Sequence, residues 1–394
     1  MLIFRLLAVG AVLFFSYASL RHGIAWSLRE RNIDAAYLMA PDDARVASAW
    51  SSARYEVGER TSARSPAVAA AEAALARDPT AVQAISTLAF DAEARGDHAR
   101  ALALAKFGQE LSRRDLKTQL FLLQMAVERN DIKDALTHYD YALRTSDEAP
   151  SLLFPILRQA VVFPQVRLNL VETMSRHPPW GSVYLYDLVS KGADLFAASA
   201  LISDLHKAGI DVPADVEDIL ITRLTEQGQM IQAWQKYQAR FPGARGDALR
   251  NGSFNRQSSS TPFDWIFPAV TGLDAHLGRE GGQGRLDYEA ISGVGGVAAR
   301  QLLVLSEGTY HLAGNAAVSR DAAPPSWGVR CTDGRSVGTV SFQKEADGSA
   351  RSAADFSIPA ACNAQWLELI VPSSDAIESN RGSITHVTIT RMRR

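Results

Sequence analysis

The sequence is poor in the patterns that build metal sites, cofactor sites and strongly charged surfaces. Its 41 basic and 43 acidic residues give a formal net charge of -2, which excludes the basic balance of a nucleic-acid-binding protein. The eight histidines are scattered, and none forms a spaced pair with another histidine or a cysteine. Gly293–Gly296 lies among expected strands, which favours a tight loop over a dinucleotide-binding turn. We therefore expect no metal, no cofactor and no nucleic-acid partner.

Catalytic motifs are also lacking. Ser341 and Lys344 match the Ser-x-x-Lys pair of acyl-serine enzymes, but the Ser-Asp-Asn and Lys-Thr-Gly elements that accompany it are absent. The carboxylates Asp215, Glu217 and Asp218 begin an expected helix, where the helix dipole favours negative charge. The sequence therefore indicates a binding protein rather than an enzyme.

Cysteine is almost absent, since Cys331 and Cys362 are the only two. Each lies beside a segment that is expected to form a strand, which permits a disulfide between them. Two buried free thiols are the alternative, and the spacing does not decide between the two interpretations. A disulfide would favour an oxidising compartment, because cytosolic proteins rarely keep such bonds.

Long apolar stretches are absent except at the N-terminus. Leu6–Leu20 holds no charged residue and would form roughly 22 Å of helix. With the apolar residues Met1–Phe4 and a snorkelling Arg5, residues 1–20 can cross a bilayer core about 30 Å thick. The sequence therefore predicts an uncleaved transmembrane helix over residues 1–20. A cleaved signal peptide, with Ser16 and Ala18 before the cut, is the alternative.

The charges around this segment conflict with the topology that the cysteines favour. Arg21, Arg29 and Arg31 follow the apolar stretch, and a positive-inside count would keep the body of the chain in the cytoplasm. The cysteine pair and the type of C-terminal domain favour the opposite side. We expect a single-pass inner-membrane protein whose body faces the periplasm.

Paired helices are predicted from about Ile33 to Pro242. This region is rich in alanine and leucine, has apolar residues at helical spacing, and breaks at glycine, asparagine and proline. Alanine recurs at an interval of 34 residues, at Ala67, Ala101 and Ala135. Such a fixed period is typical of a helical-repeat protein.

The segments around two of these alanines resemble tetratricopeptide repeats. In each, a helix with leucine and a small residue is followed by a short turn and a second helix whose alanine allows close packing. Gly96 and Asn130 occupy the turns, where both residues tolerate a left-handed backbone. The resemblance implies an α-solenoid over residues 33–242. The residues that carry it are Leu88, Ala89, Ala92, Gly96, Asp97 and Ala101, and then Leu122, Leu123, Ala126, Asn130, Asp131, Ala135, Tyr139 and Ala142.

The same resemblance implies a concave groove that binds a protein partner. In the family, the first helix of each repeat lines the groove. A solvated helix face is the alternative for any single position. The groove positions carried over to this chain are Gln83, Ser86, Phe90, Glu93, Lys117, Gln124 and Glu128.

After Pro242 the composition changes, and short apolar runs separated by turn signals predict an antiparallel β-sandwich over residues 247–394. The expected strands include Trp327–Cys331, Trp366–Val371 and Ile384–Arg391. The order of features resembles the galactose-binding-like and carbohydrate-binding-module jelly rolls. The segments that carry this resemblance are Asn251–Phe254, Pro262–Trp265, Arg300–Leu305, Glu307–Tyr310 and Ile384–Ile389.

This second resemblance implies a glycan as a candidate ligand of the sandwich. Trp265, Tyr288 and Trp327 are the candidate rings for stacking on a sugar, and burial in the core is the alternative for each. Trp366 shares one strand face with Glu368.

The chain is thus expected to be multidomain, α followed by β, with a transmembrane helix, a tetratricopeptide-like solenoid and a jelly-roll sandwich. We expect a non-enzymatic, membrane-anchored scaffold of a bacterial-type cell envelope. It would hold a protein partner in its groove and a glycan or second partner on its sandwich. By analogy with other anchored repeat proteins, the process is surface polysaccharide assembly or export. The alternative is an accessory subunit or hydrolase acting on envelope glycans through an unrecognised site in the sandwich.

Overall fold

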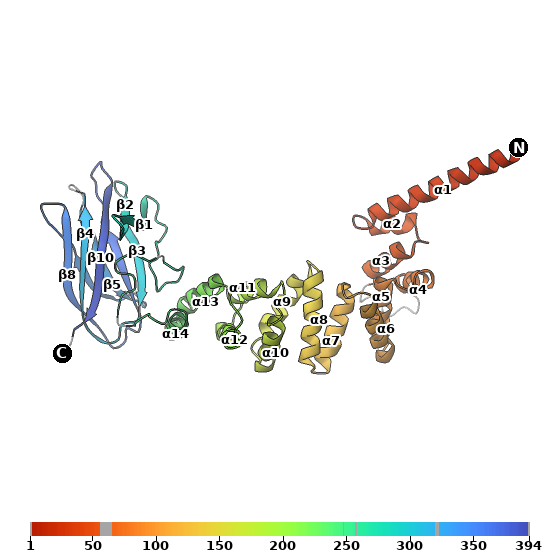
Figure 1. Ribbon diagram of the computed structural model, residues 1–394, viewed down its shortest axis with the longest axis horizontal. Helices are drawn as coiled ribbons and strands as arrows, with labels where there is room; N and C mark the ends of the chain where they lie inside the picture. Colours follow the sequence, from red (N-terminus) through yellow and green to blue (C-terminus); the bar gives the residue numbers. More distant parts are fainter. Residues whose placement is uncertain (1, 56–64, 247, 257, 320–322, 393–394) are drawn as a thin grey trace. The chain divides into compact units, whose positions relative to one another are not determined.

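The computed structural model describes residues 2–55, 65–246, 248–256, 258–319 and 323–392, with side chains described from residue 9 onward. Helices occupy the chain up to Arg240, and strands begin at Leu273 (Figure 1). This order confirms the prediction of α followed by β. Asp247, the first residue of the predicted sandwich, lies outside the described residues.

The chain divides into two compact units. Unit 1 comprises Met1–Tyr184 and Ala200–Ile210, and unit 2 comprises Leu185–Ser199 and Asp211–Arg394. The change from helix to strand therefore falls inside unit 2. The last two helices belong to the same compact unit as the strands.

Short polar side chains fix where many helices begin. Asp43, Asp97, Asp115 and Asp131 each accept a hydrogen bond from a backbone N–H in the first turn of the helix that follows. The helices of the first 184 residues are α1 (Leu2–Leu28), α2 (Ile33–Met39), α3 (Ala44–Arg54), α4 (Pro66–Arg77), α5 (Val82–Ala94), α6 (His98–Leu111), α7 (Leu116–Glu128), α8 (Ile132–Thr145), α9 (Ala149–Ala160), α10 (Pro164–Met174) and the start of α11 (Gly181–Lys191). They are followed by α12 (Leu195–Lys207), α13 (Ala214–Glu226) and α14 (Met230–Arg240).

The predicted helix pairs are present at α5–α6 and α7–α8. Gly96 and Asn130 lie in the turns with φ of 80° and 56°, the left-handed backbone that was expected of them. Ala101 is 0% exposed and Ala135 is 6% exposed, so each methyl group packs against neighbouring helices. The helical region is therefore confirmed, while its membership of the tetratricopeptide family stays a prediction.

The predicted membrane anchor is contradicted. Among the residues whose side chains are described, no helix is long and apolar enough to cross a membrane. The described apolar run, Val9–Leu20, measures about 18 Å of helix and ends at Arg21, whereas a bilayer core is about 30 Å thick. The prediction of a single-pass inner-membrane protein with a periplasmic body is therefore wrong on this structure. Met1 and the side chains of residues 2–8, which belong to the predicted segment, lie outside the described part.

Two antiparallel sheets form the β part of unit 2. The six-stranded sheet has the order β1-β2-β10-β4-β8-β7, and the four-stranded sheet has the order β3-β9-β5-β6. Their inward side chains share one apolar core, which makes the two sheets a β-sandwich. The strands are β1 (Leu273–Glu280), β2 (Gln283–Ala290), β3 (Gly296–Leu303), β4 (Gly308–Val318), β5 (Ser326–Cys331), β6 (Ser336–Ser341), β7 (Gln343–Lys344), β8 (Ser349–Ile358), β9 (Gln365–Val371) and β10 (Asn380–Arg391).

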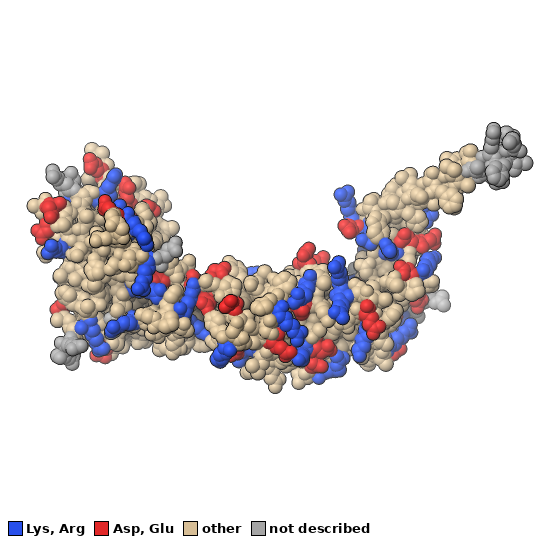
Figure 2. Space-filling model, viewed as in Figure 1, with Lys and Arg blue, Asp and Glu red and all other residues tan. Residues whose placement is uncertain are grey.

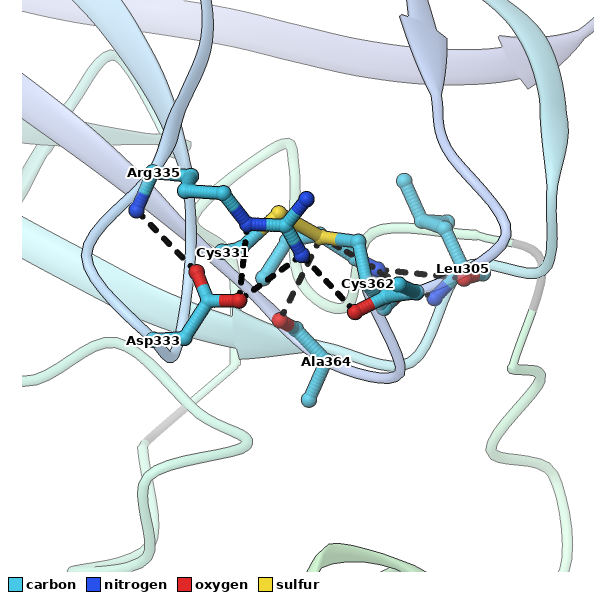
Figure 3. The surroundings of a disulfide bond; sticks show 8 residues. Leu305, Cys331, Asp333, Arg335, Cys362 and Ala364 are labelled. Carbon is cyan, nitrogen blue, oxygen red and sulfur yellow. Dashed lines mark hydrogen bonds and ion pairs between the residues drawn. A yellow bond between two sulfur atoms is a disulfide. The ribbon is translucent and has the colours of Figure 1, made fainter.

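The disulfide between Cys331 and Cys362 is confirmed (Figure 3). It joins the end of β5 to the loop before β9, and the two Cα atoms lie 5.6 Å apart. Arg335 donates to the carbonyl of Ala361 at 2.9 Å, which ties the loops on either side of the bond together. The same guanidinium donates to Asp333, and this contact lowers the pKa of the Asp333 carboxyl.

Candidate functional site

The predicted groove residues lie on two helices of unit 1, α5 and α7. Gln83, Gln124 and Glu128 are exposed, whereas Phe90, Glu93 and Lys117 are partly exposed and Ser86 is buried. The set is therefore not one continuous accessible surface. Its role as a partner-binding groove stays a prediction.

Several of these side chains make internal contacts. Lys117 donates a hydrogen bond to the carbonyl of Ser52 near the end of α3, and burial lowers the pKa of its ammonium group. Ser86 donates to the carbonyl of Gln83 within α5 at 3.0 Å. Phe90 meets Phe121 edge to face, with ring centroids 5.4 Å apart. The contacts of Lys117 and Phe90 join different helices, whereas the contact of Ser86 lies within α5.

The three candidate sugar-stacking rings are in the core of the sandwich, which corrects the sequence-based prediction. Trp265 is 1% exposed, Tyr288 is 3% exposed and Trp327 is 0% exposed. The rings of Trp265 and Trp327 face each other across 5.9 Å, so core side chains occupy the space a sugar would need. Stacking requires an open ring face, and none of these three residues offers one.

A partly exposed aromatic ring lies on the outward side of the four-stranded sheet instead. Trp366 on β9 is partly exposed, and Glu368, two residues further along, points to the same side. The sheet register places Arg300 of β3 opposite Glu368 and Arg330 of β5 opposite Trp366. The Arg300 guanidinium lies 4.4 Å from the centre of the Trp366 ring, which orients the indole through a cation–π contact. We call these four residues the Trp366 surface.

The polar groups of the Trp366 surface are incompletely paired. Arg330 Nε lies 3.5 Å from Glu368 Oε2, but this oxygen accepts no hydrogen bond within the described structure. Arg300 Nε is likewise buried without a hydrogen-bond acceptor among the described residues. Unpaired buried polar atoms are costly, so a polar ligand that reaches them is stabilised. The Arg330 side chain is 51% exposed, whereas that of Glu368 is 10% exposed.

A second hollow lies on the six-stranded sheet, with a volume of about 420 Å³. Its charged side chains already pair with one another: Arg285 Nε lies 2.8 Å from Asp287, and Arg381 lies 3.2 Å from Glu289. Tyr288 is the only aromatic among its described lining residues, and Tyr288 is buried. This hollow is therefore less suited to a sugar ring than the Trp366 surface.

An apolar cavity of about 700 Å³ lies in unit 1 between α7–α8 and α9–α10. Three of its lining side chains are largely exposed: Val127 at 60%, Ile156 at 54% and Phe163 at 63%. Pro155 interrupts the hydrogen bonding of α9 beside it. Sequence analysis missed this cavity, although the apolar stretch around Pro155 was a signal for it.

Among the described residues, no group of three or more His, Cys, Asp or Glu side chains is placed so that it could hold a metal ion.

No protein-family model matches the chain, and no curated protein matches it in sequence. Among solved structures, a carbohydrate-binding module of the CBM4 type is similar over 36% of this chain and 99% of the module, at 13% identity and a TM-score of 0.30. The CBM22-1 xylan-binding domain of Paenibacillus barcinonensis Xyn10C is similar over 39% of this chain and 99% of its own length, at 15% identity and a TM-score of 0.27. TmCBM61, solved with β-1,4-galactotriose, is similar over 38% of this chain and 97% of its own length, at 10% identity and a TM-score of 0.24. Likenesses this low carry no argument about what the present chain binds.

Proposed function

We propose that the β-sandwich is a glycan-binding module and that the Trp366 surface is its binding site. The observation that carries the proposal is the partly exposed Trp366 ring with a carboxylate and two guanidinium groups beside it. A sugar ring offers an apolar face for an aromatic ring and hydroxyl groups at its edges. The surface supplies a partner for both, as a specific ligand site requires.

Each residue has a distinct part in this proposal. Arg300 holds the indole of Trp366 in place, so little side-chain freedom is lost when a sugar stacks on it. Glu368 accepts hydrogen bonds from sugar hydroxyls through the oxygen that has no hydrogen-bond partner among the described residues. Arg330, being half exposed, swings aside and donates to the ligand.

We also propose that the module binds its glycan without cleaving it. Hydrolysis of a glycosidic bond ordinarily uses two carboxyl groups roughly 5 to 10 Å apart. On the outward side of β3, β5, β6 and β9 as described, Glu368 is the one carboxylate. A single carboxylate with an arginine beside it is better suited to binding hydroxyl groups than to general acid–base catalysis.

The test is a calorimetric titration of the purified chain with neutral oligosaccharides that a glycan array has first selected. Trp366→Ala should weaken the affinity about 3- to 10-fold, because the stacking contribution of one ring is lost. Arg381→Ala, which changes the hollow on the other sheet, is the matched control and should leave the affinity unchanged. Unchanged binding by the Trp366 variant, or loss in the Arg381 variant, would reject the proposed site.

For the helical part we propose a second function, the binding of a protein partner at the apolar cavity of unit 1. The exposed side chains of Val127, Ile156 and Phe163 favour it, because an uncovered apolar surface of this kind gains most from contact with an apolar partner. With a glycan on the sandwich, the chain would act as a scaffold that joins a protein to a polysaccharide, as in assembly or export of surface polysaccharide.

A photo-crosslinking amino acid placed at Phe163 tests this second function. It should capture one defined protein, whereas the same amino acid at Leu168 should not. Leu168 is the matched control because it is 64% exposed on the adjoining helix but does not line the cavity. Capture at both positions, or at neither, would contradict the proposal.

A further inference from the structure

A cavity of about 530 Å³ in unit 2 is lined by four arginines, Arg240, Arg245, Arg250 and Arg256. It lies between the end of α14, the segment that follows it and the end of β3. None of the described lining residues is acidic. The lining is therefore rich in N–H donors and positive charge, whereas acidic and basic residues are interspersed on the face of the helical region that Figure 2 shows.

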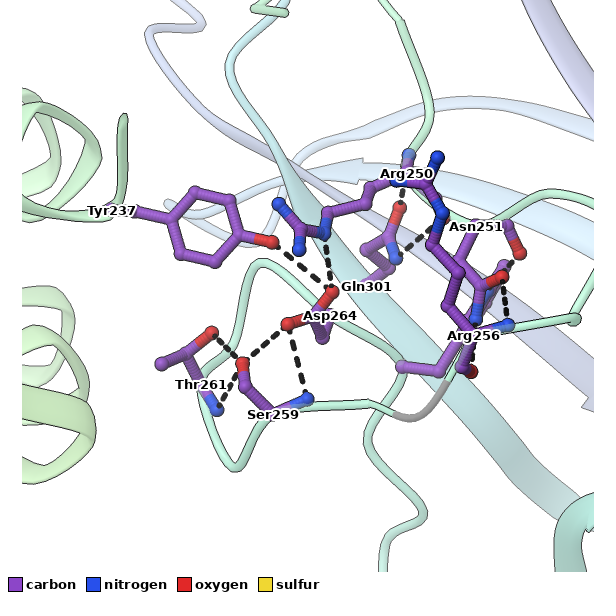
Figure 4. A network of polar contacts seen from close by, with 9 residues as sticks. Tyr237, Arg250, Asn251, Arg256, Ser259, Thr261, Asp264 and Gln301 are labelled. Atoms are coloured by element: carbon purple, nitrogen blue, oxygen red, sulfur yellow. Dashed lines mark hydrogen bonds and ion pairs between the residues drawn. The ribbon is translucent and has the colours of Figure 1, made fainter. Parts of the chain in front are cut away.

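One of these arginines is held rigidly. Arg250 Nε lies 2.8 Å from Oδ1 of the buried Asp264, and the guanidinium lies 4.1 Å from the centre of the Phe241 ring (Figure 4). The side-chain amide of Gln301 bonds to both the N–H and the carbonyl of Arg250, at 3.0 and 3.1 Å. No described residue accepts a hydrogen bond from the terminal Nη groups of Arg250. Its free donors are thus preorganised, which lowers the entropic cost of binding an anion.

The other arginines differ in how far they are neutralised. Arg240 is paired with Glu217 and Asp218, so it adds little net charge. Arg256 is exposed, and its guanidinium makes no ion pair with any residue that the structure describes. Arg250 is paired with Asp264, so it offers oriented N–H donors, whereas Arg256 supplies positive charge that no described carboxylate offsets.

An aromatic wall completes the cavity. Trp234 of α14 is partly exposed and packs against the buried Phe263, with ring centroids 5.1 Å apart. Gly246 lies against the indole edge: a Cβ at that position would be 3.6 Å from Trp234 Nε1. Because glycine has no side chain, this edge of the indole stays open toward the cavity. A ring with a polar edge can rest there.

The cavity adjoins the Trp366 surface through the sheet. Leu302 on β3 lines the cavity and is the register partner of Trp366 on β9. Paired residues of antiparallel strands have Cα atoms about 4.5 to 5.5 Å apart. The cavity and the Trp366 surface thus share neighbouring positions of β3 and β9.

We infer that this arginine-lined cavity binds the carboxylate of a uronic acid residue, so that the ligand of the sandwich is an acidic glycan. A planar guanidinium matches a carboxylate with two parallel hydrogen bonds, and the aromatic wall accommodates the sugar ring. The volume lies within the range of small-molecule sites. That the ligand is a glycan rests on the proposed function, whereas the selection of an anion depends on the cavity alone.

The experiment compares galacturonate and neutral galactose oligomers of equal length in calorimetric titrations of the full chain. The galacturonate oligomer should bind at least about tenfold more tightly at low salt, and this advantage should shrink as the salt concentration rises. Arg256→Ala should remove most of the advantage and leave neutral binding unchanged. Arg250→Lys keeps the positive charge beside Asp264 but lacks the paired N–H donors of a guanidinium. It should therefore also reduce the affinity advantage of the galacturonate oligomer. Arg351→Ala is the matched control, because Arg351 is exposed on β8 and does not line the cavity.

The outcomes separate the two claims. Equal affinity for the two oligomers, or an acidic preference that survives both cavity variants, overturns the inference and leaves the Trp366 proposal standing. An acidic preference that Arg256→Ala removes, combined with no effect of Trp366→Ala on either oligomer, supports the cavity and rejects the Trp366 surface. Tighter binding of galactose 1-phosphate or inorganic phosphate than of galacturonate overturns the assignment to a carboxylate.

Discussion

The hydroxyl of Tyr237, on α14, donates a hydrogen bond to Oδ1 of Asp264, at 3.0 Å, across 27 positions of sequence. Asp264 is buried, and Arg250 and Ser259 satisfy the rest of its carboxylate. Burial of the ring raises the pKa of the Tyr237 phenol, and the negative charge of Asp264 adds to this effect. Tyr237 therefore stays a neutral donor at neutral pH.

The first prediction concerns this buried ion pair. Asp264→Asn should lower the free energy of unfolding of unit 2 by about 3–5 kcal/mol, because the partly buried guanidinium of Arg250 would lose its counter-charge. Urea titration followed by tryptophan fluorescence measures the loss. Asp274→Asn, at a carboxylate that is 84% exposed, should change stability by no more than about 0.5 kcal/mol. Equal effects of the two substitutions would show that the pair does not stabilise the unit.

The second prediction concerns the disulfide. Replacing Cys331 and Cys362 together by alanine should cost roughly 3–4 kcal/mol, because the bond closes a segment with a sequence separation of 31 and restricts the unfolded chain. Comparison of urea midpoints for the double variant and the oxidised parent measures this cost. The reduced parent should approach the double variant. An oxidised parent no more stable than the double variant would contradict the prediction.

The third prediction concerns helix packing. Ala101→Leu should destabilise unit 1 by about 1–3 kcal/mol, because its methyl group is fully buried and a larger side chain forces the helices apart. The melting temperature reports the effect. Ala103→Leu is the matched control, since Ala103 is exposed on the same helix and leucine is nearly as good a helix former as alanine. A melting temperature that falls equally in both variants would place Ala101 outside the helix interface.

The fourth prediction concerns pH. His138 is 4% exposed, and burial lowers its pKa from 6.5, although the nearby Asp134 opposes this shift. A group whose pKa is lower in the folded state stabilises the fold above the unfolded pKa, and this stability is lost as the pH falls through the folded pKa. The free energy of unfolding should therefore decline below about pH 6.5. His138→Gln, which keeps a hydrogen-bonding group opposite Gln119, should flatten this decline. His177→Asn, at an exposed histidine with φ of 49°, should not.

Local sequence patterns were sufficient to predict most of the fold. Gly96 and Asn130 indicated the two turns in the sequence, because few other residues readily adopt a left-handed backbone. The expected strand Trp327–Cys331 matches β5 to within one residue. Such features depend on residues close together in the sequence. The α-then-β order follows from them without any knowledge of the long-range contacts.

The residues of the candidate sites were harder to predict from the sequence than the fold was. Trp327 and Trp366 both occur in strands, and alternation says only that successive side chains face opposite ways, not which way is inward. The prediction could therefore not foresee that Trp327 is buried while Trp366 is partly exposed. The cavity arginines were missed because Arg250 and its partner Gln301 are 51 positions apart, and no local pattern connects them.

The hydrogen bond from Tyr237 to Asp264 bears on how the sandwich can be prepared as a separate fragment. A fragment starting after Pro242 would lose Tyr237 and Trp234, leaving Asp264 short of one donor and Phe263 without its aromatic neighbours. A fragment starting at Asp211 keeps α13 and α14 and so retains every one of these contacts. A fragment designed to hold the sandwich with its native contacts therefore includes α14.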